Sequence, residues 1–89
     1  MTRLERIETL LAEKLTPTHL TVEDDSARHA GHAGARGGAG HYNVTVVSPH
    51  FVDMTMLERH RAVYDAVGEL IPEEIHALAV RALAPGESD

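Results

Sequence analysis

The sequence predicts a single α+β domain: a two-layer sandwich in which a three-stranded mixed sheet carries two helices on one face. Three observations predict this fold. Apolar residues recur at helical spacing in two segments, three short segments have the composition of strands, and their order is helix, strand, strand, helix, strand. Three strands are too few for a doubly wound sheet, and 89 residues provide one modest core. We expect the first two strands to pair antiparallel, and the helix before the third strand to permit a parallel pair with a right-handed crossover.

The first helix begins at a capping box formed by Thr2 and Glu5. The apolar residues at helical spacing in this segment are Leu4, Ile7, Leu11 and Leu15. Thr16-Pro17 ends the helix, because the residue before a proline avoids the α region. Residues 20–23 then alternate between apolar and polar side chains, which predicts a half-buried strand.

The segment between the first two strands, at about residues 26–41, is rich in histidine and glycine. It contains His29, His32 and His41, together with five of the seven glycines of the chain. A domain of this size normally joins two strands with a few residues, so a loop of this length indicates a function. Imidazole is the commonest metal ligand in proteins. The sequence therefore predicts a flexible loop that serves as a metal or partner site.

The second half of the chain provides a strand, a helix and a strand. Residues 42–47 are rich in β-branched side chains, and Thr55 with Glu58 forms a second capping box. The expected apolar stripe of this helix consists of Leu57, Tyr64, Val67 and Ile71, with Pro72 at its end. Residues 75–83 are mainly apolar and predict a mostly buried strand, and we expect residues 85–89 to be a frayed tail.

Composition restricts the class of protein. The formal net charge is −6, which disfavours binding to a nucleic-acid backbone, because such binding needs a basic surface. The chain contains no cysteine, so it can form no disulfide and supply no thiolate to a metal. No apolar run approaches the ~20 residues of a membrane span, and the first residues are too charged for a signal peptide. We expect a cytoplasmic protein with no membrane association.

Several stretches of this chain resemble the BolA family. They are Val22-Glu23-Asp24-Asp25-Ser26 followed by His29, His41-Tyr42, Val46-Val47-Ser48 with Phe51 beyond, Arg59-His60-Arg61-Ala62-Val63-Tyr64, and Ile75-His76-Ala77-Leu78-Ala79. The resemblance extends from about Leu4 to Pro85 and implies a fold of the class II KH-like type. The chain departs from the family pattern at Gly40, where a threonine is usual, at Asp53, where a glycine is usual, and in its last residues, which lack the usual tryptophan.

The resemblance also implies a function. BolA proteins pair with monothiol glutaredoxins, and the two share a bridging [2Fe–2S] cluster for which the glutaredoxin and a glutathione each contribute a thiolate. By this resemblance His76 is one ligand, and a residue of the loop, most simply His29, is the other. His32 and His41 are alternative loop ligands. The expected role is that of a cluster-sharing adaptor in iron–sulfur and iron homeostasis.

The residues themselves agree with such an adaptor. A [2Fe–2S] cluster needs four ligands, usually thiolates, so a chain without cysteine needs a partner to hold the cluster. Arg59 and Arg61 are candidates for partner binding, because a guanidinium pairs well with a carboxylate or phosphate. For His60 we expect a structural role, as a hydrogen bond between helix and sheet.

Two other classes of function remain in view. The first is a nucleic-acid-binding transcriptional regulator that uses the KH-like fold, for which Gly31-His32-Ala33-Gly34 matches the Gly-x-x-Gly clamp of KH domains. That match lies between two strands, where a KH clamp would join two helices. The second is an enzyme, which we do not expect, because no nucleophile with an oriented base is present in the sequence. The oligomeric state of the chain alone stays open.

Overall fold

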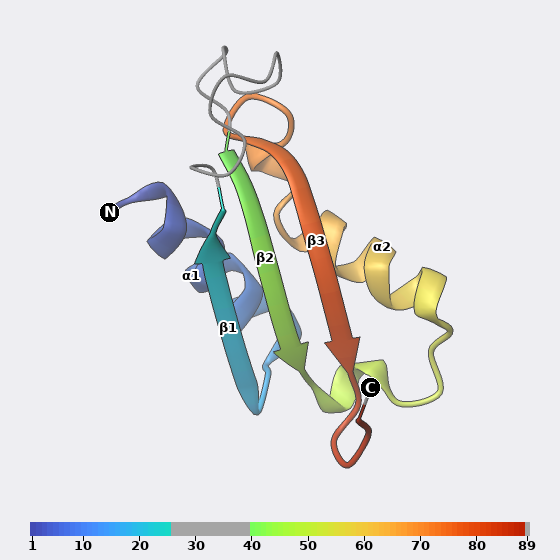
Figure 1. The fold of residues 1–89 in the computed structure, drawn as a ribbon. Coiled ribbons are helices and arrows are strands. Elements are labelled where there is room, and N and C mark those ends of the chain that lie inside the picture. Colours follow the sequence, from blue (N-terminus) through green and yellow to red (C-terminus); the bar gives the residue numbers. More distant parts are fainter. Residues whose placement is uncertain (26–39, 89) are drawn as a thin grey trace.

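The computed structural model describes residues 1–25 and 40–88 of the chain. Its elements are α1 (Arg3–Leu15), β1 (His19–Asp24), β2 (Gly40–Val47), η3 (Pro49–Phe51), α2 (Met56–Ala66), η4 (Gly68–Leu70) and β3 (Ile75–Leu83). Helices η3 and η4 are single 3-10 turns. The predicted order of helix, strand, strand, helix, strand is confirmed, and so is the α+β class (Figure 1).

The three strands form one sheet in the order β1-β2-β3. Strands β1 and β2 are antiparallel, and β2 and β3 are parallel, as predicted. Both helices pack on the same face of this sheet and leave the other face open (Figure 1). The core between the layers is almost wholly aliphatic; it includes Ile7, Leu11, Leu15, Val22, Val44, Val46, Val63, Val67 and Leu78, with Tyr42 and Phe51 as its aromatic members.

Helix α1 has the capping box that the sequence predicts. The hydroxyl of Thr2 accepts a hydrogen bond from the backbone N–H of Glu5, and the Glu5 carboxylate accepts one from the backbone N–H of Thr2. At the other end of the helix, the buried hydroxyl of Ser48 donates to the carbonyl of Leu15 at 2.5 Å. A carbonyl of the last helical turn has no partner within the helix, and the Ser48 hydroxyl supplies one. The bond also joins α1 to the residue that follows β2.

The expected apolar stripe of α2 is partly wrong, and so is its expected end at Pro72: the helix ends at Ala66, so Val67 and Ile71 lie beyond it. Val67 is buried and Ile71 is partly buried, but the side chains of Leu57 and Tyr64 are 60% and 40% exposed. The buried residues of α2 are Arg59, Val63 and Ala66. At 100° per residue these three lie on the side of the helix opposite to Leu57 and Tyr64. The reason is that Arg59 occupies a core-facing position, which a hydropathy pattern assigns to the surface.

Strand β3 is less buried than the sequence predicts. Its burial follows the two faces of the sheet: Ile75, Leu78 and Ala82 are buried, whereas the intervening Ala77 and Ala79 are exposed. The expectation of a mostly buried strand is wrong because β3 is an edge strand and the helices cover only one face of the sheet. Alanine is apolar but small, so its exposure has a low cost.

The structure also changes the bounds of the long loop. Strand β2 begins at Gly40, so Gly40 and His41 belong to the sheet. The rest of the predicted loop, 26–39, lies outside the described residues. Its expected flexibility therefore stays a prediction. None of the helices within the described part of the chain has the length and apolar character needed to cross a membrane.

Candidate functional site

His41 and His76, which are far apart in the sequence, lie side by side at the start of two neighbouring strands. Their ring centroids are 5.1 Å apart, and the ring planes are tilted by 52°. The two strands run parallel, so the beginnings of β2 and β3 meet at the same end of the sheet. The parallel register alone therefore brings together two imidazoles that belong to different motifs.

A bulge in β3 sets the position of His76. Gly40 pairs with Ile75 and His41 pairs with Ala77, so His76 is an extra residue between two ladder positions. Bulges of this kind redirect a side chain and are common beside functional sites. His76 is exposed at this position, whereas His41 is half-buried and its Nε2 atom is buried. A role for His76 as a core histidine is thereby excluded.

The backbone around the histidine pair is well held. The N–H of Asp25, just after β1, donates to the carbonyl of His41 at 2.7 Å, and the N–H of Gly40 donates to the carbonyl of Glu74 at 3.0 Å. Beside the pair, a shallow depression is floored by Ala77 and Ala79 and bordered by Asp25. His41 lines this depression, and of the two histidines only His76 is exposed.

Two imidazoles supply half of the four ligands that a [2Fe–2S] cluster needs. Neutral imidazole binds iron, zinc and copper, and two histidines on one iron occur in Rieske-type [2Fe–2S] centres. Within the described residues, no group of three or more histidine, aspartate or glutamate side chains is placed to hold a metal ion. The two histidines therefore fit a metal or cluster only when ligands from outside the described residues complete the set, and no cysteine of this chain can be among them.

The structure describes only one of the three histidines predicted as loop ligands. His41, predicted as an alternative, is the histidine that the structure brings to His76. His29 and His32 lie outside the described residues, so their roles stay predictions. The adjacency of His41 to His76 was not visible in the sequence, because it depends on the register of a parallel pair.

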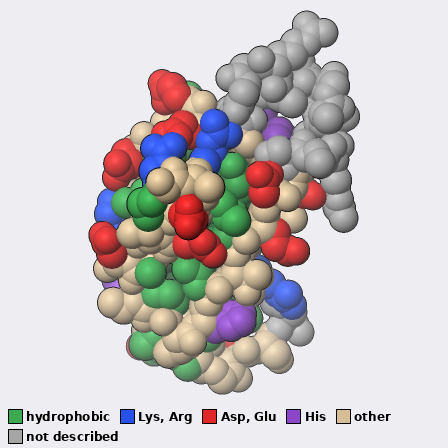
Figure 2. All heavy atoms as spheres, turned by 90° about the vertical axis from the view of Figure 1, so that its left-hand side faces the viewer, with side chains coloured by type: hydrophobic (Ala, Val, Ile, Leu, Met, Phe, Trp, Pro, Cys, Tyr) green, Lys and Arg blue, Asp and Glu red, His purple; other side chains and the backbone are tan. Residues whose placement is uncertain are grey.

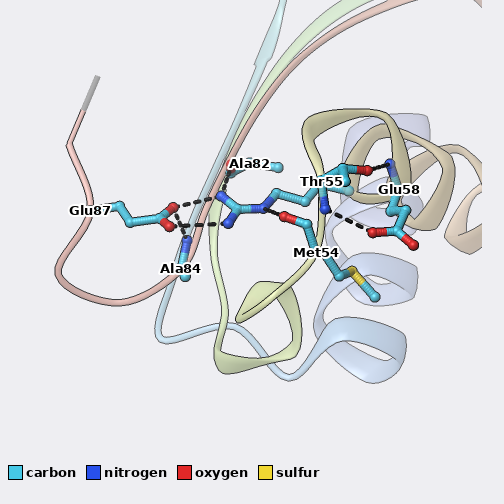
Figure 3. A network of polar contacts seen from close by, with 7 residues as sticks. Met54, Thr55, Glu58, Ala82, Ala84 and Glu87 are labelled. Carbon is cyan, nitrogen blue, oxygen red and sulfur yellow. Dashed lines mark hydrogen bonds and ion pairs between the residues drawn. The ribbon is translucent and has the colours of Figure 1, made fainter.

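Arg59 does not have the surface position expected for a partner-binding residue. It is 7% exposed, and its Nη1 and Nη2 atoms donate to the two carboxylate oxygens of Glu87 at 2.5 and 3.0 Å (Figure 3). Its Nε donates to the carbonyl of Met54, and Nη1 also donates to the carbonyl of Ala82. The N–H of Ala84 donates to the same Glu87 carboxylate at 2.9 Å.

The guanidinium of Arg59 is thus engaged within the protein. Of the two arginines predicted to bind a partner, Arg61 is the one that is exposed.

This contact also corrects the prediction of a frayed tail. Glu87 is held at its carboxylate, and a turn at Gly86, with φ of 88°, returns the chain toward β3. The hydrogen bonds from Arg59 and from the Ala84 N–H lower the pKa of Glu87 from its ordinary value of 4.5 to about 2. One glutamate in a short polar tail carries no periodic signal, so nothing in the sequence indicated this role.

His60 does not form the predicted link between helix and sheet through its Nε2 atom. That atom is buried and has no hydrogen-bond partner among the residues that the structure describes. The link is made instead by Tyr64, whose hydroxyl donates to the carbonyl of Leu78 at 2.7 Å. A phenol reaches farther than an imidazole, and Leu78 lies on the edge strand beside the helix.

The side of the molecule that carries α1 has a mixed surface charge (Figure 2). Figure 2 shows acidic side chains scattered among the basic ones on this side, so that no continuous basic surface is present in that view. Arg3 and Arg6, two basic residues of α1, both pair with Glu74. A phosphate backbone would therefore meet no extended row of cations on this side.

Comparison with known proteins agrees with the fold and the motifs. A family model described as BolA-like protein matches residues 11–87. Among curated proteins, the chain is 39% identical to Protein BOLA1, chloroplastic, of Arabidopsis thaliana over 89 residues, which covers 97% of this chain and 56% of that protein. It is 38% identical over 76 residues to the DNA-binding transcriptional regulator BolA of Escherichia coli, with 85% and 70% covered.

Among solved structures, the BolA domain of SufE1 from Arabidopsis thaliana superposes with a TM-score of 0.86 at 36% identity. That match covers 99% of this chain and 98% of the solved domain. The chain spans only 24% of SufE-like protein 1 from the same organism and 56% of BOLA1. It is therefore similar to one domain of these longer proteins.

Proposed function

Because this chain belongs to the BolA-like protein family, we propose that it is a non-catalytic adaptor that shares a [2Fe–2S] cluster with a monothiol glutaredoxin. The adaptor acts in iron–sulfur and iron homeostasis. It contributes imidazoles, the glutaredoxin contributes a thiolate, and a glutathione contributes a second thiolate. When bound, the cluster supplies iron and electron-transfer chemistry that the protein alone lacks.

The observation that supports this proposal most directly is the His41–His76 pair. Its rings are 5.1 Å apart at one end of the sheet, and His76 is exposed there. A redox-active cluster shared between two proteins needs ligands at a surface that the partner can approach. Replacing thiolates with neutral imidazoles lowers the negative charge of the centre, which raises its reduction potential when both imidazoles bind one iron.

His76 is the first ligand in this proposal. The second is His29, which the family resemblance favours, or else His32 or His41, and the contact between the rings supports His41. These candidates make different predictions, because His41 is held in β2 and the other two belong to the connection between strands. Removing each one separately therefore distinguishes them.

The experiment is reconstitution of the full chain with a monothiol glutaredoxin, glutathione, iron and sulfide, followed by visible circular dichroism. We expect a heterodimer spectrum for the wild type and its loss in His76→Ala. Parallel samples of His29→Ala, His32→Ala and His41→Ala identify the second ligand. His50→Ala is the matched control, because His50 is an exposed histidine on η3, away from the pair. A heterodimer cluster that is unchanged in His76→Ala would overturn the proposal.

A nucleic-acid-binding regulator is the second candidate, and the name of the Escherichia coli relative favours it. The net charge of −6 opposes it. A gel-shift titration at low salt tests this function with wild type and Arg61→Ala. Salt-sensitive binding that weakens in Arg61→Ala would support it, and no binding at low salt would eliminate it. A cytoplasmic location stays a prediction, since BOLA1 is named as chloroplastic.

A further inference from the structure

Most of the large apolar side chains that the fold leaves exposed belong to one segment of the chain. Within the described residues, the large hydrophobic side chains that are exposed belong to Met1, Val52, Met56, Leu57 and Tyr64. Four of these five lie between residues 52 and 64, in and just before α2. Scattered exposed hydrophobics are ordinary, but a grouped set marks an interaction surface.

Three residues of α2 share one exposed face. Leu57, Arg61 and Tyr64 are spaced i, i+4 and i+7, which places them in a row along the helix. We call this row the α2 stripe. It lies opposite the core-facing residues Arg59 and Val63. The hydrogen bond to Leu78 accounts for the hydroxyl of Tyr64, but the burial of the core does not account for the exposed side chain of Leu57.

Tyr64 is held in a fixed orientation. Its hydroxyl donates to the carbonyl of Leu78 at 2.7 Å, while the residue remains 40% exposed. An aromatic ring that is already fixed loses little conformational entropy when a partner covers it. Rigid aromatic and arginine side chains are the types most often found at the energetic centre of protein interfaces.

The charge of the stripe indicates the chemistry of its partner. Arg61 is exposed and makes no ion pair with any described residue. Glu58 at i−3 and Asp65 at i+4 are the acidic residues within one turn of Arg61. The carboxylate of Glu58 is engaged by the backbone N–H of Thr55 at 2.8 Å, and the charge of Arg61 is the smallest of the causes that act on the pKa of Glu58. The cation is thus available to a carboxylate from outside, between two apolar side chains.

The same charge disfavours a second copy of this chain as the occupant. A two-fold antiparallel contact centred between Leu57 and Tyr64 would place Arg61 against its own counterpart. Two like charges in a desolvated contact are destabilising. A partner with an acidic residue among apolar ones is the better complement.

The α2 stripe lies near the strand that carries His76. The bond from Tyr64 ends on Leu78, two residues beyond His76 on the same strand. Figure 1 shows α2 alongside β3, on the side of the sheet away from β1. A protein seated on the stripe therefore lies next to the strand that carries the exposed imidazole.

We propose that the α2 stripe is the docking surface for the cluster-sharing partner, which meets it with a carboxylate flanked by apolar side chains. This inference rests on the proposed function. It divides the interaction into two parts: the stripe provides affinity between the two proteins, and His76 provides cluster ligation. The complex therefore forms even without iron.

The test is isothermal titration of a monothiol glutaredoxin into the full chain, with glutathione and without iron. Leu57→Ser and Arg61→Gln are the stripe variants. Val52→Ser is the matched control for the leucine, because Val52 is 54% exposed and lies outside the stripe. Lys14→Gln is the matched control for the arginine, because Lys14 is an exposed cation on α1. Far-UV circular dichroism verifies that each variant is folded.

We expect Leu57→Ser to weaken the iron-free complex by about tenfold, because the variant no longer buries an apolar side chain against the partner. Arg61→Gln weakens it by a smaller factor that decreases with salt. Both controls and His76→Ala bind as the wild type does, while His76→Ala alone loses the cluster spectrum.

Three results would overturn the inference. If stripe variants bind like the wild type while the cluster still depends on His76, docking occurs elsewhere and the proposed function stands. If neither an iron-free complex nor a cluster forms with the wild type, both proposals fail. If sedimentation shows a wild-type homodimer that Leu57→Ser dissociates, the occupant is a second copy of this chain.

Discussion

Arg59 and Glu87 form a two-point contact that joins the buried side of α2 to the C-terminal segment. Both outer nitrogens of the guanidinium meet the carboxylate, and the N–H of Ala84 adds a third hydrogen bond to it (Figure 3). The Arg59 side chain is 8% exposed and that of Glu87 is 43% exposed, so removal of the carboxylate leaves a buried guanidinium without its counter-charge. The contact therefore makes the last residues part of the fold.

The first prediction concerns removal of this carboxylate. Glu87→Ala leaves the guanidinium of Arg59, a 7% exposed residue, with only backbone carbonyls as partners. We expect a clear decrease in melting temperature and faster proteolysis at the C-terminus. Glu8→Ala on α1 is the control, because it removes a carboxylate that has no such partner among the described residues. Equal melting temperatures for the two variants would contradict the structural role.

The second prediction is a pH dependence of stability from the same group. The pKa of Glu87 is lowered in the folded protein from 4.5 to about 2, chiefly by the hydrogen bonds from Arg59. A lowered carboxylate pKa stabilises the fold above the ordinary value and loses that contribution as pH decreases through the folded value. The melting temperature of the wild type should therefore exceed that of Glu87→Gln at pH 6. The difference should decrease between pH 4.5 and about 2; a difference that stays constant over this window would contradict the assignment.

The third prediction tests the orientation of α2. Leu57 is 60% exposed, whereas Leu11 of α1 is fully buried. Leu11→Ala should lower the free energy of unfolding by about 2–5 kcal/mol, the usual cost of a cavity. Leu57→Ala should change it by less than about 0.5 kcal/mol, as for most surface positions. Urea denaturation measures both, and a large loss in Leu57→Ala would mean that the leucine is a core residue.

The fourth prediction concerns the glycine that precedes His41. A Cβ added at Gly40 would lie 2.5 Å from the Cε2 atom of Tyr42, so the buried ring would have to move. We expect Gly40→Ala to destabilise the protein by about 1–3 kcal/mol, as overpacking does. It should also weaken the cluster complex, because the adjacent His41 is displaced. Gly68→Ala is the control, since nothing lies within 4 Å of its added Cβ.

The secondary structure was predictable because its signals are local. Both capping boxes form as expected. In each one the threonine and the glutamate are only three residues apart, so the pattern can be recognised in the sequence. The alternation predicted for residues 20–23 also appears in β1, where Leu20 is half-buried and Val22 buried while Thr21 and Glu23 are exposed. The face of α2 was not predictable in the same way, because Arg59 is polar in sequence but buried through partners as distant as Glu87.

The sequence by itself determined the order of the elements, their caps, the family motifs and the set of histidines available as ligands. These depend on neighbouring residues, on side-chain periodicity and on residue type. Only the tertiary structure decided that His41 lies against His76, that Leu57 faces outward and that Glu87 neutralises Arg59. Each of these depends on how distant segments meet: the parallel register with its bulge, the rotation of α2 about its axis and the return of the tail. Such relationships are set by the summed packing of the whole core, and no local pattern encodes them.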